Sequence, residues 1–218
     1  MLRLEIYQET AHFRIATIGM PYLSYPLPPP STVFGFLRAI TDYESINYQN
    51  TKLSIQGVYK SSSLEKEQLI LQTKKEIKTN IISIQKLHQC KWIIHVKSPF
   101  EEKIKNAIQN SSKILRLGRK EDLIIDINLY DVEEQEFDNL KIFPKTEIEG
   151  IKLKTYKNWN KDEYTRGSLF KMALDTIVNE EEEIIGYKPI NLVYIDINSM
   201  KNNIKIGDGE YLIQWIRI

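Results

Sequence analysis

A loop of mixed aromatic and basic character follows the first apolar stretch of the chain. His12, Phe13, Arg14, Tyr22 and Tyr25 lie within "ETAHFRIATIGMPYLSYPLPPP", residues 9–30. Aromatic rings and guanidinium planes stack on splayed nucleobases, and an arginine also binds phosphate. Phe13 and one tyrosine fit the core equally well, so the prediction of RNA contact is clearest for Arg14.

A second basic segment is centred on a glycine. In "RLGRKED", residues 116–122, Arg116, Arg119 and Lys120 surround Gly118. The glycine either lets the backbone approach a ligand or makes a turn. Three cations beside it favour phosphate contact over a plain turn.

Three prolines precede an apolar run in "YPLPPPSTVFGFLRAI", residues 25–40. Prolines keep the preceding residues extended, so a helix cannot begin before Pro30. Ser31 is then the expected N-cap, with Thr32 as the alternative. Either the positive helix end faces an RNA phosphate, or the prolines serve only to pin the preceding loop.

Residues for acid–base chemistry are few. "QKLHQ" places Lys86 beside His88, and a metal-independent RNA cleavage needs a base for the 2′-hydroxyl and a cation for the developing charge. The alternative is a polar loop that touches phosphates or solvent. His95 lies inside an apolar strand and is expected in the core or at a sheet edge.

The sequence shows neither a phosphate-loop motif nor a nucleophile elbow, and its histidines and single cysteine lack metal-ligand spacing. We therefore expect no metal and no cofactor. The lone Cys90 argues against disulfides, and no apolar run approaches the roughly 20 residues of a membrane span. The N-terminus resembles a strand rather than a signal peptide, so we expect a cytoplasmic protein with no membrane contact.

Charge is unevenly distributed along the 218 residues, although the formal net charge is only +1. Residues 1–49 carry a net charge of −1, residues 50–120 carry +10, and residues 121–218 carry −8. A cationic block between acidic neighbours indicates a polyanion on one side and a protein partner on another, unless the lysines are merely solvated.

The hydrophobic pattern predicts strands and helices in a simple order. The strands are expected at 2–8, 51–60, 89–98 and 123–132, the helices at 31–43 and 99–113, and an exposed ribbon at 67–80. This order predicts an α+β fold, a ferredoxin-like (RRM-like) βαββαβ domain over residues 1–135 with an inserted β-ribbon. Residues 136–218 are expected to form a small β-rich C-terminal part with a helix at 166–178.

Three segments, taken together, carry a family resemblance. "AHFRI", "YPLPPPSTVFGFLRAI" and "LGRKEDL", in this order and within a βαββαβ frame, resemble the fifth Cas family of CRISPR systems, which belongs to the RAMP superfamily. The resemblance covers the N-terminal two thirds of the chain. In length and motif style it is closest to the type I-B branch.

The resemblance implies a subunit of a type I Cascade surveillance complex in antiviral defence. Such a subunit holds the 5′ handle of the CRISPR RNA, contacts the backbone subunit and the large subunit, and meets target DNA only indirectly. The β-ribbon, residues 61–86, would be a "thumb" that kinks the RNA.

The resemblance also assigns roles to individual residues. The cations expected at RNA phosphates are Arg14, Arg38, Arg116, Arg119, Lys120 and the thumb residues Lys74, Lys75, Lys78 and Lys86, with Gly118 among them. His12, Tyr22 and Tyr25 would meet handle bases. Ser31 and Thr32 would offer hydroxyl and backbone N–H groups.

Two alternatives remain. One branch of the family, type I-C, cleaves repeat RNA with a tyrosine, a lysine and a histidine. Tyr43, Lys86 and His88 are the nearest equivalents here, although Leu87 separates the last two. The other alternative is an RRM-like module unrelated to CRISPR.

Overall fold

The computed structural model describes residues 1–16, 18–72, 77–137, 144–161, 166–178, 184–199 and 205–217. In chain order its elements are β1 (Leu2–Ala11), α1 (Pro30–Ile40), β2 (Lys52–Gln72), β3 (Ile77–Lys97), α2 (Glu101–Gln109), β4 (Asp126–Asp131), β5 (Gln135–Phe137), β6 (Glu147–Ile148), β7 (Ile151–Lys152), β8 (Lys154–Asn158), β9 (Ser168–Val178), β10 (Ile184–Asp196), the 3-10 helix η1 (Ile197–Ser199) and β11 (Lys205–Gly207).

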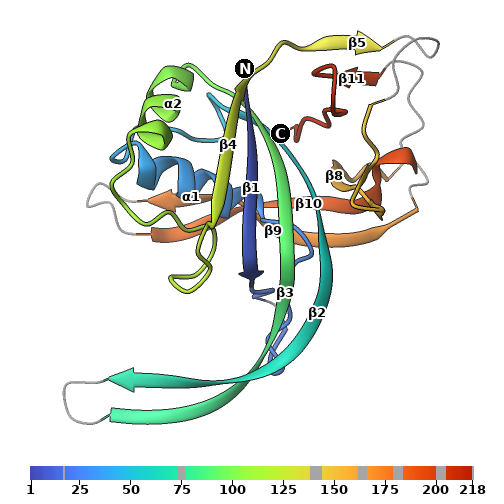
Figure 1. Ribbon diagram of the computed structural model, residues 1–218. Helices are drawn as coiled ribbons and strands as arrows, with labels where there is room; N and C mark the ends of the chain where they lie inside the picture. The colour runs from blue at the N-terminus through green and yellow to red at the C-terminus, as the bar shows by residue number, and fades with distance from the viewer. Residues whose placement is uncertain are drawn as a thin grey trace.

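The main sheet holds seven of the described strands, in the order β4-β1-β3-β2-β8-β10-β9 (Figure 1). Neighbouring strands in it run antiparallel. Two helices accompany the sheet, so the predicted α+β class is confirmed. Strands from beyond residue 135 extend the sheet of the N-terminal strands, and the predicted division of the chain at that point stays a prediction.

The predicted ribbon is not a separate element. β2 and β3 pair in one unbroken register from Lys52↔Lys97 to Gln72↔Ile77, so the thumb is the outer half of two long strands. Figure 1 shows this hairpin curving away from the body. The separate strands and ribbon expected at 51–60, 67–80 and 89–98 are therefore wrong in their boundaries, because strand pairing continues through the polar residues between them.

The core lies between the sheet and the helices. Leu4 of β1 and Ile94 of β3 are fully buried partners that face the helices, as the alternation of the strand predicts. Trp92 is also fully buried and pairs with Gly57 of β2. A Cβ atom at Gly57 would lie 2.4 Å from Cε3 of Trp92, so the indole ring needs a glycine at this position.

The start of α1 differs from the expected one. Pro29 is the N-cap and Pro30 is the first helical residue, and no side chain caps the helix. The expected caps Ser31 and Thr32 are wrong, because Pro30 already has the φ angle that a helix requires and fits the first position. The helix ends at Ile40, before Tyr43, which has φ of 65°.

The predicted helix at 166–178 is wrong, because these residues form β9. Met172 and Leu174 alternate as buried residues on one side of the strand, and β9 pairs with β10 along its length. Tertiary pairing has overridden the helical preference of alanine, leucine and methionine.

Residues 208–212, near the C-terminus, lie on the other face of β1 and β3. Ile93, Tyr211 and Leu212 belong to a second, smaller apolar cluster there. The "IGDG" turn places Asp208, whose side chain is fully buried, against Arg3 of β1 and His95 of β3. The two faces of one sheet are thus covered in different ways.

Candidate nucleic-acid interface

The three segments that carry the resemblance meet at one groove with a volume of about 480 Å³. It lies between the loop after β1, the exposed side of α1 and the turn at residues 116–119. Its lining consists of His12, Phe13, Arg14, Thr32, Gly35, Phe36, Ala39, Arg116, Gly118 and Arg119. Residues about 100 positions apart in the chain therefore share one surface.

Two arginines of this groove are exposed. The guanidinium carbon of Arg14 lies 3.9 Å from the ring centroid of Tyr22, in a cation–π contact. Arg116 belongs to a short bridge with Leu123. Neither arginine forms an ion pair with any residue in the part of the chain that the structure describes, so both charges are available to an anion.

Asp122 organises the turn beside the groove. Its buried carboxylate accepts hydrogen bonds from the backbone N–H of Arg119 (2.9 Å) and of His12 (3.3 Å), which ties the turn to the loop after β1. Gly118 has φ of 112°, and a Cβ atom there would lie 2.9 Å from the Asp122 carboxylate. Asp122 was not predicted as a site residue, although an acid inside a basic segment was a signal for it.

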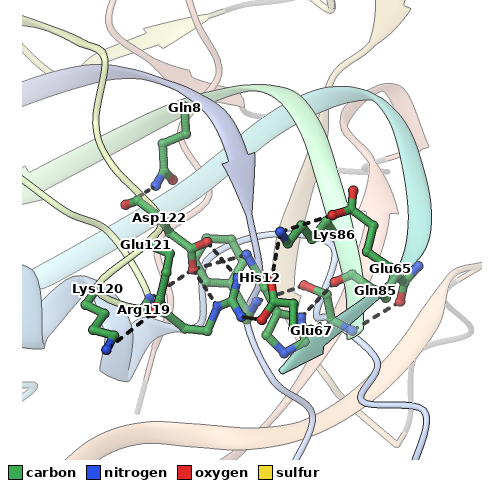
Figure 2. Close-up of polar contacts among 12 residues, drawn as sticks. Gln8, His12, Glu65, Glu67, Gln85, Lys86, Arg119, Lys120, Glu121 and Asp122 are labelled. Carbon is green, nitrogen blue, oxygen red and sulfur yellow. Dashed lines mark hydrogen bonds and ion pairs between the residues drawn. The ribbon is translucent and has the colours of Figure 1, made fainter. Parts of the chain in front are cut away.

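The Arg119 side chain points toward acidic partners of the protein itself (Figure 2). Its guanidinium donates to both oxygens of Asp122, each at 3.3 Å, and to Oε2 of Glu67 at 2.9 Å. Burial disfavours its charge, but the hydrogen bonds and charges of these two carboxylates outweigh that effect and raise the pKa of Arg119. The expected phosphate ligand is thus already paired.

Lys86 and His88 do come together, on Glu65 of β2. Nζ of Lys86 lies 3.1 Å from Glu65 and 2.8 Å from Glu67, and Nε2 of His88 lies 3.5 Å from Glu65. The hydrogen bond to Glu67 is the main cause that raises the pKa of Lys86. Tyr43 is 77% exposed in the α1–β2 connection, and no contact among the described residues joins it to this pair.

Two other residues expected to contact RNA make contacts within the fold. Tyr25 is buried, its hydroxyl donates to the carbonyl of Lys171, and its ring meets that of Phe170 edge-on. Arg38 pairs with Asp175 at 2.9 Å and also donates to Thr176 and to a backbone carbonyl. Both side chains are therefore occupied by contacts within the fold, and their contact with RNA stays a prediction.

His12 is also buried, although it lines the groove. Its Nδ1 lies 2.7 Å from the carbonyl oxygen of Gln85, and burial lowers its pKa. The neutral ring is held by the backbone and forms part of the groove wall, and its contact with a handle base stays a prediction.

The remaining expected residues divide by position. Thr32 is half-buried in the groove wall and Ser31 is half-buried beside it. The Lys120 side chain is 83% exposed, 3.7 Å from Glu121. Lys74 and Lys75 lie outside the described residues, as does the side chain of Lys78.

Two features are absent from the described residues. Among the described residues, no cluster of three or more His, Cys, Asp or Glu side chains could hold a metal ion. No helix in that same part of the chain is both long and apolar enough to cross a membrane.

No protein-family model matches the chain, and no curated protein matches it. Among solved structures, the chain is similar to a chain of a CRISPR RNA-guided surveillance complex, with a TM-score of 0.58, 11% identity and coverage of 89% of each chain. At this identity the likeness is one of fold.

Two further structures have lower TM-scores. A Cas protein in a crystal structure gives a TM-score of 0.37 at 14% identity, over 55% of this chain and 57% of that one. A chain of the type III-B Cmr-beta complex, bound to cognate target RNA and AMPPnP, gives 0.45 at 14% identity, over 93% and 90%.

Proposed function

We propose that this protein is a non-catalytic RNA-binding subunit of a Cascade-type CRISPR surveillance complex, where it caps and holds the 5′ handle of the CRISPR RNA. One observation carries the proposal: the three segments that resemble the fifth Cas family converge on one groove. Two of its arginines form no ion pair with any described residue. The fold shared with a chain of a surveillance complex supports it.

The proposal includes the family, the fifth Cas family in its type I-B branch, and a cytoplasmic location. The chain order β1-α1-β2-β3-α2-β4 and the strand order β4-β1-β3-β2 support a ferredoxin-like unit of the RAMP kind. The partners we propose are the Cascade backbone subunit and large subunit, with target DNA met only indirectly.

Binding in this groove would be driven by the backbone of the RNA. Arg14 and Arg116 would contact phosphates, and the Arg14–Tyr22 pair offers a flat surface on which a splayed base can stack. Gly35 supports close approach, since nothing lies within 4 Å of a Cβ atom built there.

The alternative of a free-standing RRM-like module is less well supported. Such modules read RNA with aromatic residues on the open face of the sheet. Here Arg3 and His95 occupy that face of β1 and β3, and Asp208 lies over both. An RNA strand could reach this part of the sheet only if the C-terminal residues moved away.

Cleavage of repeat RNA is a second candidate, favoured by one observation, the shared contact of Lys86 and His88 with Glu65. The test is incubation of the purified protein with repeat RNA in chelator. A specific cut that disappears in His88→Ala would support a nuclease. No specific cut, or a cut that survives the substitution, would support the non-catalytic proposal.

The leading proposal is tested by a charge-matched pair of variants. Arg14→Gln/Arg116→Gln should weaken binding of single-stranded repeat RNA about tenfold or more, because two charge-assisted contacts are lost. The slope of log affinity against log salt should fall by about 1.4, since each phosphate contact contributes about 0.7 on a single strand.

The control is Arg166→Gln/Arg217→Gln, which removes two exposed arginines from outside the groove. It alters the net charge equally, so an equal loss of affinity in both variants would contradict the site. Co-purification with a co-expressed operon, followed by sequencing of the bound RNA, tests the complex. RNA without a repeat-derived 5′ end would contradict the proposed role.

A further inference from the structure

A ladder of alternating charges runs from the groove to the thumb (Figure 2). It begins at Asp122, passes through Arg119 to Glu67 at 2.9 Å, and continues to Lys86 at 2.8 Å and Glu65 at 3.1 Å. It therefore links the turn at 116–122 to the hairpin of β2 and β3, which lies about 30 to 60 positions earlier in the chain.

This ladder differs from an ordinary surface ion pair. Asp122 is fully buried, and the side chains of Arg119, Glu67 and Lys86 are 25%, 27% and 19% exposed. Partly desolvated charges that share several hydrogen bonds hold their geometry better than single exposed pairs, which contribute little. The hydrogen bonds from Lys86 and Arg119 overcome burial and keep the pKa of Glu67 low.

The thumb needs such support because the neighbouring strands of the sheet do not pair with its outer part. β1 pairs with β3 only as far as Ala11↔Leu87, and β8 pairs with β2 only at Gln56 and Gly57. Beyond these points the hairpin is a two-stranded ribbon, which twists and is marginal on its own.

Several contacts brace the ribbon where it leaves the sheet, and they come from the groove and from the loop that lines it. Nδ1 of His12 lies 2.7 Å from the carbonyl oxygen of Gln85. Tyr22, which carries Arg14 on its ring, forms a parallel bridge to Ile84 of β3. Arg119, in the groove lining, contacts Glu67 of β2. The direction of the thumb is thereby coupled to the groove.

We propose that Glu67 is a positioning residue for RNA binding: by holding Arg119, it fixes the thumb at the angle at which RNA in the groove continues onto the thumb. This inference rests on the proposed function. Glu67 touches no RNA, since its carboxylate would repel phosphate. It acts through Arg119 and Lys86.

Because Glu67 is an acid, the direction in which its removal changes RNA affinity distinguishes two explanations. Simple electrostatics says that removing a carboxylate beside an RNA site strengthens binding. Positioning says that the same change weakens binding, because the thumb loses its brace. The two explanations therefore predict opposite results for Glu67→Gln.

The experiment compares Glu67→Gln with Glu121→Gln in the full chain. Glu121 is an exposed acid of the same turn that pairs with Lys120, so the control alters the charge equally and leaves the ladder intact. Single-stranded repeat RNA is the probe. We expect Glu67→Gln to lose about tenfold in affinity with an unchanged salt slope, and Glu121→Gln to bind at least as well as the parent protein.

A second readout needs no RNA. Amide hydrogen exchange of residues 77–86 in the free protein should speed up in Glu67→Gln and stay unchanged in Glu121→Gln. Glu67→Asp, which keeps the charge, should recover part of the protection and part of the affinity. Equal thermal unfolding of the variants would show that the body of the protein remains folded.

The outcomes separate the two proposals. If Arg14→Gln/Arg116→Gln loses affinity while Glu67→Gln binds as well as Glu121→Gln, the positioning role is wrong and the RNA site stands. Unchanged exchange in Glu67→Gln also overturns the positioning role. If neither the arginine variant nor Glu67→Gln loses affinity, the proposed function itself fails.

Discussion

The two faces of strands β1 and β3 are held by different forces. The face with Leu4 and Ile94 packs on the helices through apolar contacts. The opposite face carries Arg3 and His95, which meet Asp208 from the C-terminal residues. Apolar packing is spread over many side chains, whereas a buried ionic cluster depends on each member, so the second face should be the more fragile.

The ionic cluster is closely connected. Nη1 of Arg3 lies 2.8 Å from Asp208 and Nη2 lies 2.6 Å from Glu210, while Nε2 of His95 lies 3.0 Å from Asp208. Nδ1 of His95 is buried and has no hydrogen-bond partner among the described residues. Burial is the main cause that lowers the pKa of His95, so its ring is neutral and Nε2 donates to Asp208.

The largest effect is expected at the centre of this cluster. Asp208→Asn leaves the Arg3 guanidinium buried without its main counter-charge, which should cost about 3–5 kcal/mol of unfolding free energy. Urea unfolding at neutral pH measures it, with exposed Asp126→Asn as the control. A loss below about 1 kcal/mol would show that substitutions on the two faces cost similar unfolding free energy.

The second largest effect is expected from a fall in pH, which should lower the contribution of the ionic face to the unfolding free energy. Because the folded pKa of His95 lies below its usual value, the unfolded chain binds this proton first as pH falls below about 6.5. Stability should therefore be complete above that pH and fall by up to about 1.4 kcal/mol per pH unit below it.

The measurement is urea unfolding between pH 7.5 and 5. His95→Gln should flatten the curve in part, since His12 also has a lowered pKa and contributes in the same direction. If the slope of unfolding free energy against pH is unchanged in His95→Gln, the pH dependence does not arise from this face. Asp208 loses its charge only at lower pH, because hydrogen bonds from His95, the backbone and Arg3 outweigh burial and lower its pKa.

The apolar face should respond more weakly and without pH dependence. Ile94→Val removes one buried methylene from a fully buried side chain and should cost about 1 kcal/mol. The same urea series measures this cost at each pH. A cost that changes between pH 7.5 and 5 would mean that the two faces are coupled.

The smallest effect concerns RNA on the ionic side of the sheet. Lys60 and Lys91 lie on that side and both pair with Glu149. If RNA binds in the groove, Lys60→Gln/Lys91→Gln should change affinity for single-stranded repeat RNA by less than about twofold. A loss as large as that of the Arg14→Gln/Arg116→Gln variant would move the RNA site to this side.

What the sequence predicted well depends on neighbours along the chain. Alternation in "LRLEIYQ" predicts the buried side of β1, and the order of elements predicts the α+β class. The helix expected at 166–178 failed because its residues satisfy both periods, and only pairing with β10 decides between them. The element boundaries in the thumb failed because pairing between β2 and β3 continues through polar residues that interrupt the apolar pattern.

The sequence shows which residues have side chains suited to the candidate site, but it does not show which of them are paired with other residues of the protein. Arg14 and Arg119 look alike in sequence, each a cation beside a turn. Arg14 stays unpaired with acids among the described residues, whereas Arg119 pairs with Glu67, which lies 52 positions away. Likewise "IGDG" has the residue types of a turn, but nothing in these four residues shows that Asp208 pairs with Arg3, 205 positions away.

Because β2 and β3 keep one register along the whole hairpin, the length of the thumb is set by the number of residue pairs in it. Each pair added at its tip would lengthen its reach by about 3.4 Å, and two pairs would keep every side chain on its present side. One extra residue in a single arm would instead turn that arm over and carry the mismatch back to Trp92 and Gly57. Reach can thus vary by small symmetric steps, while the body of the protein stays as it is.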